Sequence, residues 1–260
     1  MTQLIKSTSG IRGVIGESLT PDIALKTGLT LGTINPKGTI IIGGDTRTSH
    51  TMLKNSLTSG LIATGCNIID IGKVPTPTLQ QMISYYKASG GVMITASHNP
   101  IIWNGLKLMN KHGSFFSEEE FNNFSKLYDS ETFKLSDWEN QGNYKQEYNA
   151  INKHIEKIFS IFPQDPIKNS NLKVLIDPNN GAGCIATPLL LDKLFIYYEI
   201  LNSKPSGIFS HTPEPTKDNL EQLQLEMKKG NFDIGFAQDP DADRLVIIDE
   251  KGNFIGEDYS

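Results

Sequence analysis

Three aspartates at alternate positions, in Asp239-Pro-Asp-Ala-Asp-Arg244, are the clearest chemical signal in the sequence. Carboxylate oxygens are the ligands that Mg²⁺ and Ca²⁺ prefer, and like charges this close are costly without a cation. Glu250 falls at the twelfth position of an EF-hand-like loop, but Arg244 stands at the sixth, where that loop requires glycine. The flanking runs are also strand-like. A metal site of another kind is therefore favoured over an EF-hand and over a solvated acidic turn.

A second segment, Thr95-Ala-Ser-His-Asn-Pro100, places Ser97 between the end of a strand-like run and a His-Asn-Pro turn. Phosphoryl transfer needs a well-positioned oxygen, and His98 beside it is a potential proton carrier. From composition alone, an ordinary Asx-type turn is the favoured interpretation of this segment. The adjacent serine and histidine do not by themselves form a triad, because triads assemble in space.

Two further segments, Ser9-Gly-Ile-Arg-Gly13 and Gly43-Gly-Asp-Thr-Arg-Thr-Ser49, set an arginine among glycines. The glycines allow a tight backbone turn while the guanidinium forks toward an oxyanion. Each signal is weak alone. Arg47 is as compatible with a structural ion pair as with an anion site.

Strand-like and helix-like segments alternate along the chain. Short apolar, β-branched runs predict strands at 39–43, 67–72, 91–95, 172–177, 197–201, 233–237 and 245–249. Helical patterns cover 48–64, 151–159 and 216–229, and another ends near Leu194. Thr76 is predicted as the N-cap of a helix with Pro77 at its first position, and Ser117-Glu-Glu-Glu120 as a capping box.

This alternation predicts an α/β protein with two consecutive three-layer α/β/α domains and mixed sheets. The polar stretch 130–148 and the prolines after the 151–159 helix place the boundary between domains 1–148 and 149–260. In such sheets ligands bind beyond the carboxyl ends of the strands, and Ser97 falls just past one of them.

The bulk composition excludes several classes of protein. The 260 residues include 38% hydrophobic and 20% charged residues, and 24 basic against 29 acidic residues give a net charge of −5. No basic run indicates a nucleic acid or an anionic membrane as partner. No signal peptide is evident, and no run approaches the roughly 18 apolar residues of a membrane helix. Cys66 and Cys184 are isolated, which predicts reduced thiols in a cytoplasmic protein.

Together, and in this order, these motifs resemble those of the α-D-phosphohexomutases, the phosphoglucomutase, phosphomannomutase and phosphoglucosamine mutase family. Pro213-Glu-Pro215 ahead of Asp218-Asn-Leu220 also matches a family segment, so the resemblance covers essentially the whole chain. It implies a mutase that interconverts hexose 6-phosphate and hexose 1-phosphate through a phosphoserine and a bisphosphorylated sugar. A non-catalytic sugar-phosphate binder and a metal-dependent phosphatase are the alternatives.

The resemblance also implies roles for particular residues. Ser97 would be the phosphoserine, and it would complete one Mg²⁺ site with Asp239, Asp241 and Asp243. Lys107, His98 and Arg12 would handle protons and charge, and the phosphate or substrate would be bound by Arg244, Arg47 and Asn104. Lys107 serves as a base only if burial and neighbouring arginines depress its pKa. A sugar 1,6-bisphosphate would act as activator.

The family has four domains, and the resemblance is to the first two. It therefore implies that domains 3 and 4, which would complete the active site around the sugar phosphate, are absent from this chain. We expect the 260 residues alone to bind Mg²⁺ but to turn over sugar phosphates poorly. The motifs leave open which hexose phosphate is preferred.

Overall fold

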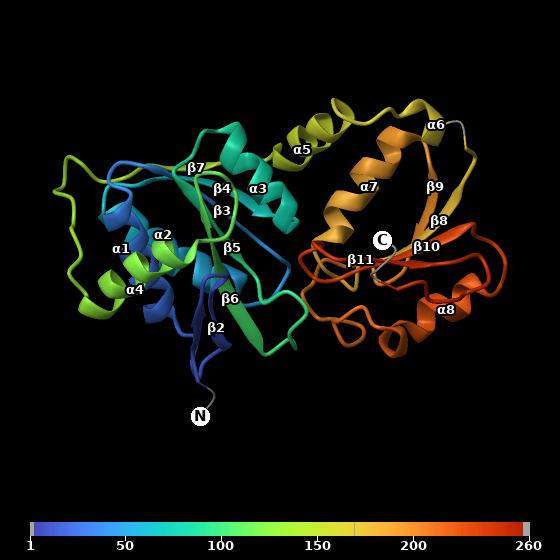
Figure 1. Cartoon of the computed structure of the whole chain (residues 1–260), viewed down its shortest axis with the longest axis horizontal. Coiled ribbons are helices and arrows are strands. Elements are labelled where there is room, and N and C mark those ends of the chain that lie inside the picture. The colour runs from blue at the N-terminus through green and yellow to red at the C-terminus, as the bar shows by residue number, and fades with distance from the viewer. Residues whose placement is uncertain (1–2, 169, 257–260) are drawn as a thin grey trace.

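A computed structural model describes residues 3–168 and 170–256 of the chain. It contains two β-sheets, one built by each half of the chain, with helices packed on both faces of each sheet (Figure 1). The predicted fold class is confirmed: both sheets are mixed and both halves have three layers. Along the chain the two sheets are separated by α5 (Ala150–Phe159) and the short α6 (Asp165–Lys168). The boundary at residue 148 stays a prediction.

The first sheet has seven strands in the order β1-β2-β6-β5-β3-β4-β7. Four of them, β3, β4, β5 and β7, run parallel, while β6 is antiparallel to β5 and to β2. Their bounds are β1 (Ile5–Ser7), β2 (Gly10–Val14), β3 (Thr39–Gly44), β4 (Asn67–Lys73), β5 (Gly90–Ile94), β6 (Trp103–Asn110) and β7 (Tyr144–Gln146). The parallel strands therefore all end at the same edge, where their connecting loops gather.

Helices cover this sheet on both sides. One face packs against α1 (Pro21–Ile34), α2 (His50–Ala63) and α4 (Glu118–Ser130), and the other against α3 (Thr76–Tyr85) and α5. The α4 capping box is confirmed, because the Ser117 hydroxyl accepts from the Glu120 N–H and the Glu120 carboxylate accepts from the Ser117 N–H. Helix α1 has no counterpart among the predicted elements.

The second sheet has four strands in the order β11-β10-β8-β9, with β10 parallel to β8 and β8 parallel to β9, and β11 antiparallel at one edge. Its strands are β8 (Lys173–Asp177), β9 (Tyr197–Ile200), β10 (Ile234–Gln238) and β11 (Leu245–Ile248). One face packs against α7 (Gly183–Leu194), and the other against α8 (Glu221–Met227), which follows the 3₁₀ helix η1 (Lys217–Leu220). The seven strands predicted from β-branched runs are all present.

One cap prediction is wrong. Thr76 is the first helical residue of α3 and Pro75 is its N-cap, and no side chain caps this helix. The Thr76 hydroxyl instead donates to the Asp241 carboxylate of the other half, at 2.6 Å. The hydroxyl that the local pattern assigned to the helix cap therefore forms its hydrogen bond with the other half of the chain.

The carboxyl-end loops of the two sheets meet along a seam. The Thr46 hydroxyl, after β3, donates to the Asn180 carbonyl oxygen at 2.8 Å, and the Arg47 guanidinium lies 4.8 Å from the centre of the Phe209 ring. Helix α5 spans both halves, with Ala150 in the core of the first and Phe159 against the core of the second (Figure 1). No helix among the described residues is long and apolar enough to cross a bilayer.

Candidate functional site

The loop after β5 holds Ser97 in an unusual backbone conformation. Its φ angle is +49°, in the left-handed region, which costs a non-glycine residue roughly 1–3 kcal/mol. The Ser97 N–H donates to the Thr95 hydroxyl at 2.9 Å, and its carbonyl oxygen accepts from Arg47 at 2.7 Å. Strain that is held in place this firmly is typical of a functional position.

Arg47 is fully buried and holds the backbone of this loop through hydrogen bonds. Its Nε donates to Asp45 at 3.1 Å, and its two Nη atoms donate to the backbone carbonyl oxygens of Ser97, Asn99, Pro100 and Trp103 at 2.7–2.9 Å. These bonds use the whole guanidinium, so Arg47 has no N–H left for a substrate phosphate. The prediction that Arg47 binds phosphate is wrong, and the structural ion pair is correct.

Asp45 completes this support, and its role was not predicted. One Oδ accepts from the Arg47 N–H, and the other accepts from Arg47 Nε and from the Thr95 hydroxyl at 2.6 Å. Burial raises the pKa of Asp45 to about 6, against the opposing influence of Arg47 and Thr95. The serine loop is therefore fixed at both of its ends by one buried carboxylate and its partners.

Asn104 also departs from its predicted role. It is fully buried in β6, its Nδ2 donates to the Ser49 hydroxyl at 2.8 Å, and its Oδ1 accepts from the Gly105 N–H. A side chain enclosed in this way cannot reach a substrate. The prediction that it binds substrate is wrong, because a strand position two residues from a loop has been drawn into the core.

The three aspartates lie in the turn between β10 and β11. Ala242, between the last two, has a φ of +51°, and this turn brings the N–H groups of Asp243 and Arg244 to Asp239 Oδ1 at 3.2 Å each. One carboxylate oxygen from each of Asp239, Asp241 and Asp243 lies within 4.8 Å of the others. The hairpin thus brings together the three carboxylates that stand at alternate positions in the sequence.

The serine loop and the aspartate turn touch across the seam. Ser97 Oγ donates to Asp239 Oδ2 at 2.9 Å. Lys107, in β6, donates to Asp241 Oδ2 at 2.6 Å and to Asp243 Oδ2 at 3.0 Å. Residues separated by more than 130 positions in the chain therefore form one hydrogen-bonded cluster.

The donor set fits a divalent cation such as Mg²⁺. Asp241 Oδ1 is buried and makes no hydrogen bond with any described residue, which leaves one costly carboxylate oxygen in need of a positive partner. Burial and the neighbouring charges of Asp241 and Asp243 hold the pKa of Asp239 well above its ordinary value. Hard oxygen donors with an excess of negative charge are the chemistry that Mg²⁺ requires.

A depressed pKa, the condition under which Lys107 would serve as a base, is not found in the structure. Burial lowers the pKa of Lys107, but the carboxylates of Asp241 and Asp243 outweigh burial and hold the pKa above its ordinary value. Lys107 is therefore a protonated hydrogen-bond donor to the aspartate turn.

His98 and Arg12 lie near Ser97. His98 Nδ1 is 3.4 Å from Ser97 Oγ, and burial together with the positive charge of Arg244 lowers the pKa of His98. Arg12 Nη1 donates to the Asn99 side chain at 3.4 Å. Arg12, Ser97 and Lys107 together line a cavity of about 40 Å³ beside the serine.

Arg244 follows the aspartates directly and is half-buried. Its Nη1 lies 3.8 Å from a carboxylate oxygen of Glu214, which belongs to the Pro213-Glu-Pro215 segment. Both groups act on the pKa of His98, Arg244 lowering it and Glu214 raising it. The sequence marks Glu214 only as part of the Pro213-Glu-Pro215 segment, and in the structure its charge acts on His98 of the serine loop.

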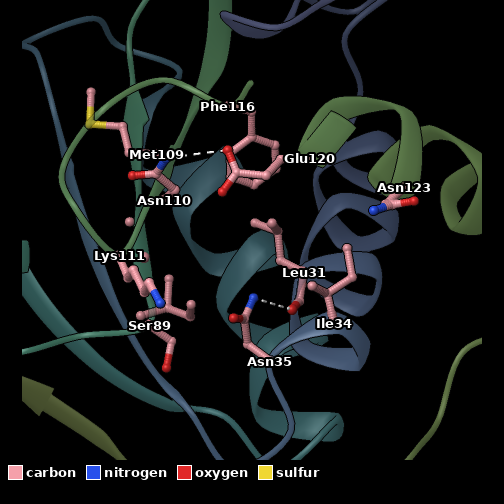
Figure 2. Close-up of a pocket in the computed structure, with 13 residues that line it drawn as sticks. Leu31, Ile34, Asn35, Ser89, Met109, Asn110, Lys111, Phe116, Glu120 and Asn123 are labelled. Carbon is pink, nitrogen blue, oxygen red and sulfur yellow. Dashed lines mark hydrogen bonds between the residues drawn. The ribbon is translucent and has the colours of Figure 1, made fainter. Parts of the chain in front are cut away.

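A separate pocket of about 220 Å³ lies at the opposite end of the first sheet (Figure 2). Ile40 and Gly90, at the amino ends of β3 and β5, form part of its wall, and the Asn110 amide donates to Glu120 at its rim. None of the residues predicted to act in catalysis or binding lines this pocket. The predicted residues gather instead at the carboxyl ends of the strands.

Comparison with known proteins agrees with this geometry. Residues 3–135 match the family model for phosphoglucomutase/phosphomannomutase α/β/α domain I, and residues 152–252 match that for domain II. Over 248 residues the chain is 44% identical to a probable phosphoglucosamine mutase of Pyrococcus horikoshii, covering 95% of this chain and 54% of the relative. It is 39% identical to a phosphoglucomutase/phosphomannomutase of Thermococcus kodakarensis over 257 residues, covering 96% and 56%.

Among solved structures, a putative phosphomannomutase from Thermus thermophilus superposes with a TM-score of 0.87 at 25% identity, covering 98% of this chain and 59% of that one. The chain thus spans about half the length of the curated relatives it matches. Both of its halves match consecutive domains of one family, in the same order and over nearly all of its length. The chain belongs to the phosphoglucomutase/phosphomannomutase family of phosphohexomutases, of which it comprises domains I and II.

Proposed function

We propose that this chain carries the phosphoserine and the metal-binding aspartates of a mutase that interconverts hexose 6-phosphate and hexose 1-phosphate. The single observation that carries the proposal is the 2.9 Å hydrogen bond between Ser97 Oγ and Asp239 Oδ2, which joins the two motifs across the seam. A serine in a strained, firmly held loop beside a three-carboxylate cluster is suited to phosphoryl transfer, where catalysis is mainly positioning and charge stabilisation.

In this proposal, phosphorylated Ser97 gives up its phosphoryl group to a hydroxyl of the sugar phosphate. The bond between phosphorus and Ser97 Oγ breaks and a bond from phosphorus to the sugar oxygen forms. The proton of the sugar hydroxyl passes to a base of the protein, and Ser97 Oγ takes up a proton to become a hydroxyl again. The second phosphate of the resulting bisphosphate then returns to Ser97. His98, 3.4 Å from Ser97 Oγ, is the proton acceptor within reach, and the protonated Lys107, which lines the same cavity, is a proton donor within reach.

The aspartates Asp239, Asp241 and Asp243 would hold one Mg²⁺, together with an oxygen of phosphorylated Ser97. A bound Mg²⁺ would supply positive charge that stabilises the transferring phosphoryl group. Arg12 and Arg244, whose positive charges both lower the pKa of His98, would bind phosphate oxygens through their guanidinium groups. A sugar 1,6-bisphosphate would prime Ser97 by phosphorylating it. Glucosamine phosphate is the first sugar to test, because the Pyrococcus relative is named a probable phosphoglucosamine mutase.

Phosphate transfer to Ser97 tests the proposal directly. The chain is incubated with glucose 1,6-bisphosphate and Mg²⁺, and the peptide that contains Ser97 is examined by mass spectrometry. We expect one phosphate on Ser97, and none in the Ser97→Ala variant. Ser9→Ala is a matched control, because Ser9 lines the same cavity yet contacts the side chain of Ser7 and not the aspartates.

The outcome also separates the alternatives. A phosphatase would release inorganic phosphate continuously from the bisphosphate, whereas a mutase retains it on Ser97. A non-catalytic binder would bind the sugar phosphate with Ser97 unmodified. Because the chain spans about half the length of its relatives, we propose that complete turnover by these 260 residues is far below that of a full-length relative. Near-normal mutase turnover by the chain alone would contradict that part of the proposal.

A further inference from the structure

Thr76 connects the first half of the chain to the aspartate turn through two hydrogen bonds. It is the first residue of α3 and is 2% exposed. Its hydroxyl donates to Asp241 Oδ2 at 2.6 Å, and its backbone N–H donates to the Asp241 carbonyl oxygen at 2.9 Å. The N-terminus of α3 thus holds both the main chain and the side chain of the central aspartate.

These bonds determine how the Asp241 carboxylate is oriented. Oδ2 accepts from Thr76 and from Lys107, while Oδ1 is buried and makes no hydrogen bond with any described residue. Lys107 has a long, flexible side chain, and its amine donates to both Asp241 and Asp243. Thr76 is short, buried and attached to a helix, so it restrains the carboxylate more firmly.

We propose that Thr76 is a positioning residue for the metal site, which fixes the Asp241 carboxylate so that Oδ1 stays available as a ligand. The inference rests on the proposed Mg²⁺ site. It assigns to domain I a direct part in the cation affinity of the domain II turn. Hydrogen-bond partners that orient metal-binding carboxylates typically change metal affinity about 10- to 100-fold when they are removed.

A purely structural role for Thr76 is less consistent with the geometry. Pro75 is the N-cap of α3, and the Thr76 hydroxyl forms no cap hydrogen bond within the helix. A valine at this position would keep the size and β-branching of the side chain and the backbone N–H bond to Asp241. The only group lost would be the hydroxyl, and the only described partner of that hydroxyl is Asp241.

The test is Mg²⁺ binding by the chain, measured by isothermal titration calorimetry and repeated with Mn²⁺ by electron paramagnetic resonance. We expect Thr76→Val to weaken binding about tenfold or more, and Thr76→Ser, which keeps the hydroxyl, to stay within about threefold of the parent. Thr78→Val is the matched control. Thr78 is buried in the same first turn of α3, but its hydroxyl contacts His154 at 3.0 Å, so cation binding should be unchanged.

Each outcome separates this inference from the proposed function. Thermal unfolding without added metal shows whether the variants keep their fold. If the parent binds Mg²⁺, Asp243→Asn loses it and a folded Thr76→Val binds as tightly as the parent, the positioning role is refuted while the metal site stands. If Thr78→Val weakens binding as much as Thr76→Val, the effect comes from α3 as a whole and the inference also fails. If the parent does not bind Mg²⁺, both the inference and the proposed metal site fall.

Discussion

The two loops that meet at the seam are held in different ways. The serine loop is fastened from within its own domain, because Asp45, Thr95 and Arg47 are buried and bond to its backbone on both sides of Ser97. In the aspartate turn, Asp239 Oδ1 accepts from the turn's own backbone, while Asp239 Oδ2 accepts from Ser97. The hydrogen bonds to the side-chain oxygens of Asp241 and Asp243 come from domain I. The backbone of the serine loop is thus held within domain I, whereas the side chains of Asp241 and Asp243 depend on contacts across the seam.

The largest effect is expected from removing the support of the serine loop. In Arg47→Met, the Asp45 carboxylate stays buried without its cation and four carbonyl oxygens lose a donor, so the free energy of unfolding should fall by about 3–5 kcal/mol. Urea denaturation measures this loss. The double variant Asp45→Asn/Arg47→Met should lose less than the two single variants added together. A loss below about 1 kcal/mol would show that the loop does not depend on Arg47.

The region around His50 in domain I and the region around His211 in domain II should also respond oppositely to acid. Burial and the positive charge of Lys54 lower the pKa of His50 from 6.5 to about 4, so its unfolded form gains a proton first as the pH falls. The stability that neutral His50 gives is present above pH 6.5 and is lost toward pH 4, by about 3 kcal/mol at most. His50→Gln should remove this loss from domain I.

For His211, burial lowers the pKa, but the hydrogen bond and charge of Asp177 outweigh burial and raise it above 6.5. Its contribution is therefore complete below pH 6.5 and is lost as the pH rises through the raised value. Hydrogen exchange of peptides from α2 and from 201–212, corrected for intrinsic rates, resolves the two regions. Acid should weaken protection in α2 and preserve it around His211, and a parallel response in both regions would contradict the assignment.

The smallest effect concerns a contact of the seam that does not involve the aspartate side chains. In Thr46→Val, the Asn180 carbonyl oxygen loses a buried donor at 2.8 Å, and the free energy of unfolding should fall by about 1 kcal/mol. Thr48→Val is the control, because Thr48 is exposed and should change little. Mg²⁺ affinity should change less than in Thr76→Val. An equal loss of affinity in both variants would mean that the whole seam, rather than Thr76, positions the metal ligands.

Much of the fold follows from local sequence. The β-branched runs of β3, β4 and β5 predict strands because such side chains pack well on a pleated, buried surface. Helix α1 escapes prediction because its Thr- and Gly-rich sequence has low intrinsic helix propensity. It is helical because it packs closely on α2, where a Cβ on Gly28 would lie 2.3 Å from the Leu57 carbonyl oxygen and one on Gly60 would lie 2.4 Å from that of Leu25. That stabilisation exists only after the two helices meet.

In the candidate site, too, some features follow from local sequence and others only from tertiary packing. The three aspartates and Ser97 are visible in sequence, because short spacing and strand-end placement are local properties. The roles of Arg47 and Asn104 are not visible in the sequence, because either side chain could face an anion or the protein interior. Which of the two it faces depends on the loop that packs against it. Thr76 reads locally as a cap, and the turn of the other domain makes it a partner of Asp241.

What the sequence determined by itself was the set of chemical groups, their order along the chain and the family to which they belong. Tertiary structure alone decided which groups touch: Ser97 with Asp239, Lys107 and Thr76 with Asp241, and Arg47 with the carbonyl oxygens beneath the serine. The physical reason is that charge and hydrogen-bonding capacity are properties of a residue. Burial, orientation and pKa depend on neighbours that the chain brings together from more than a hundred positions away.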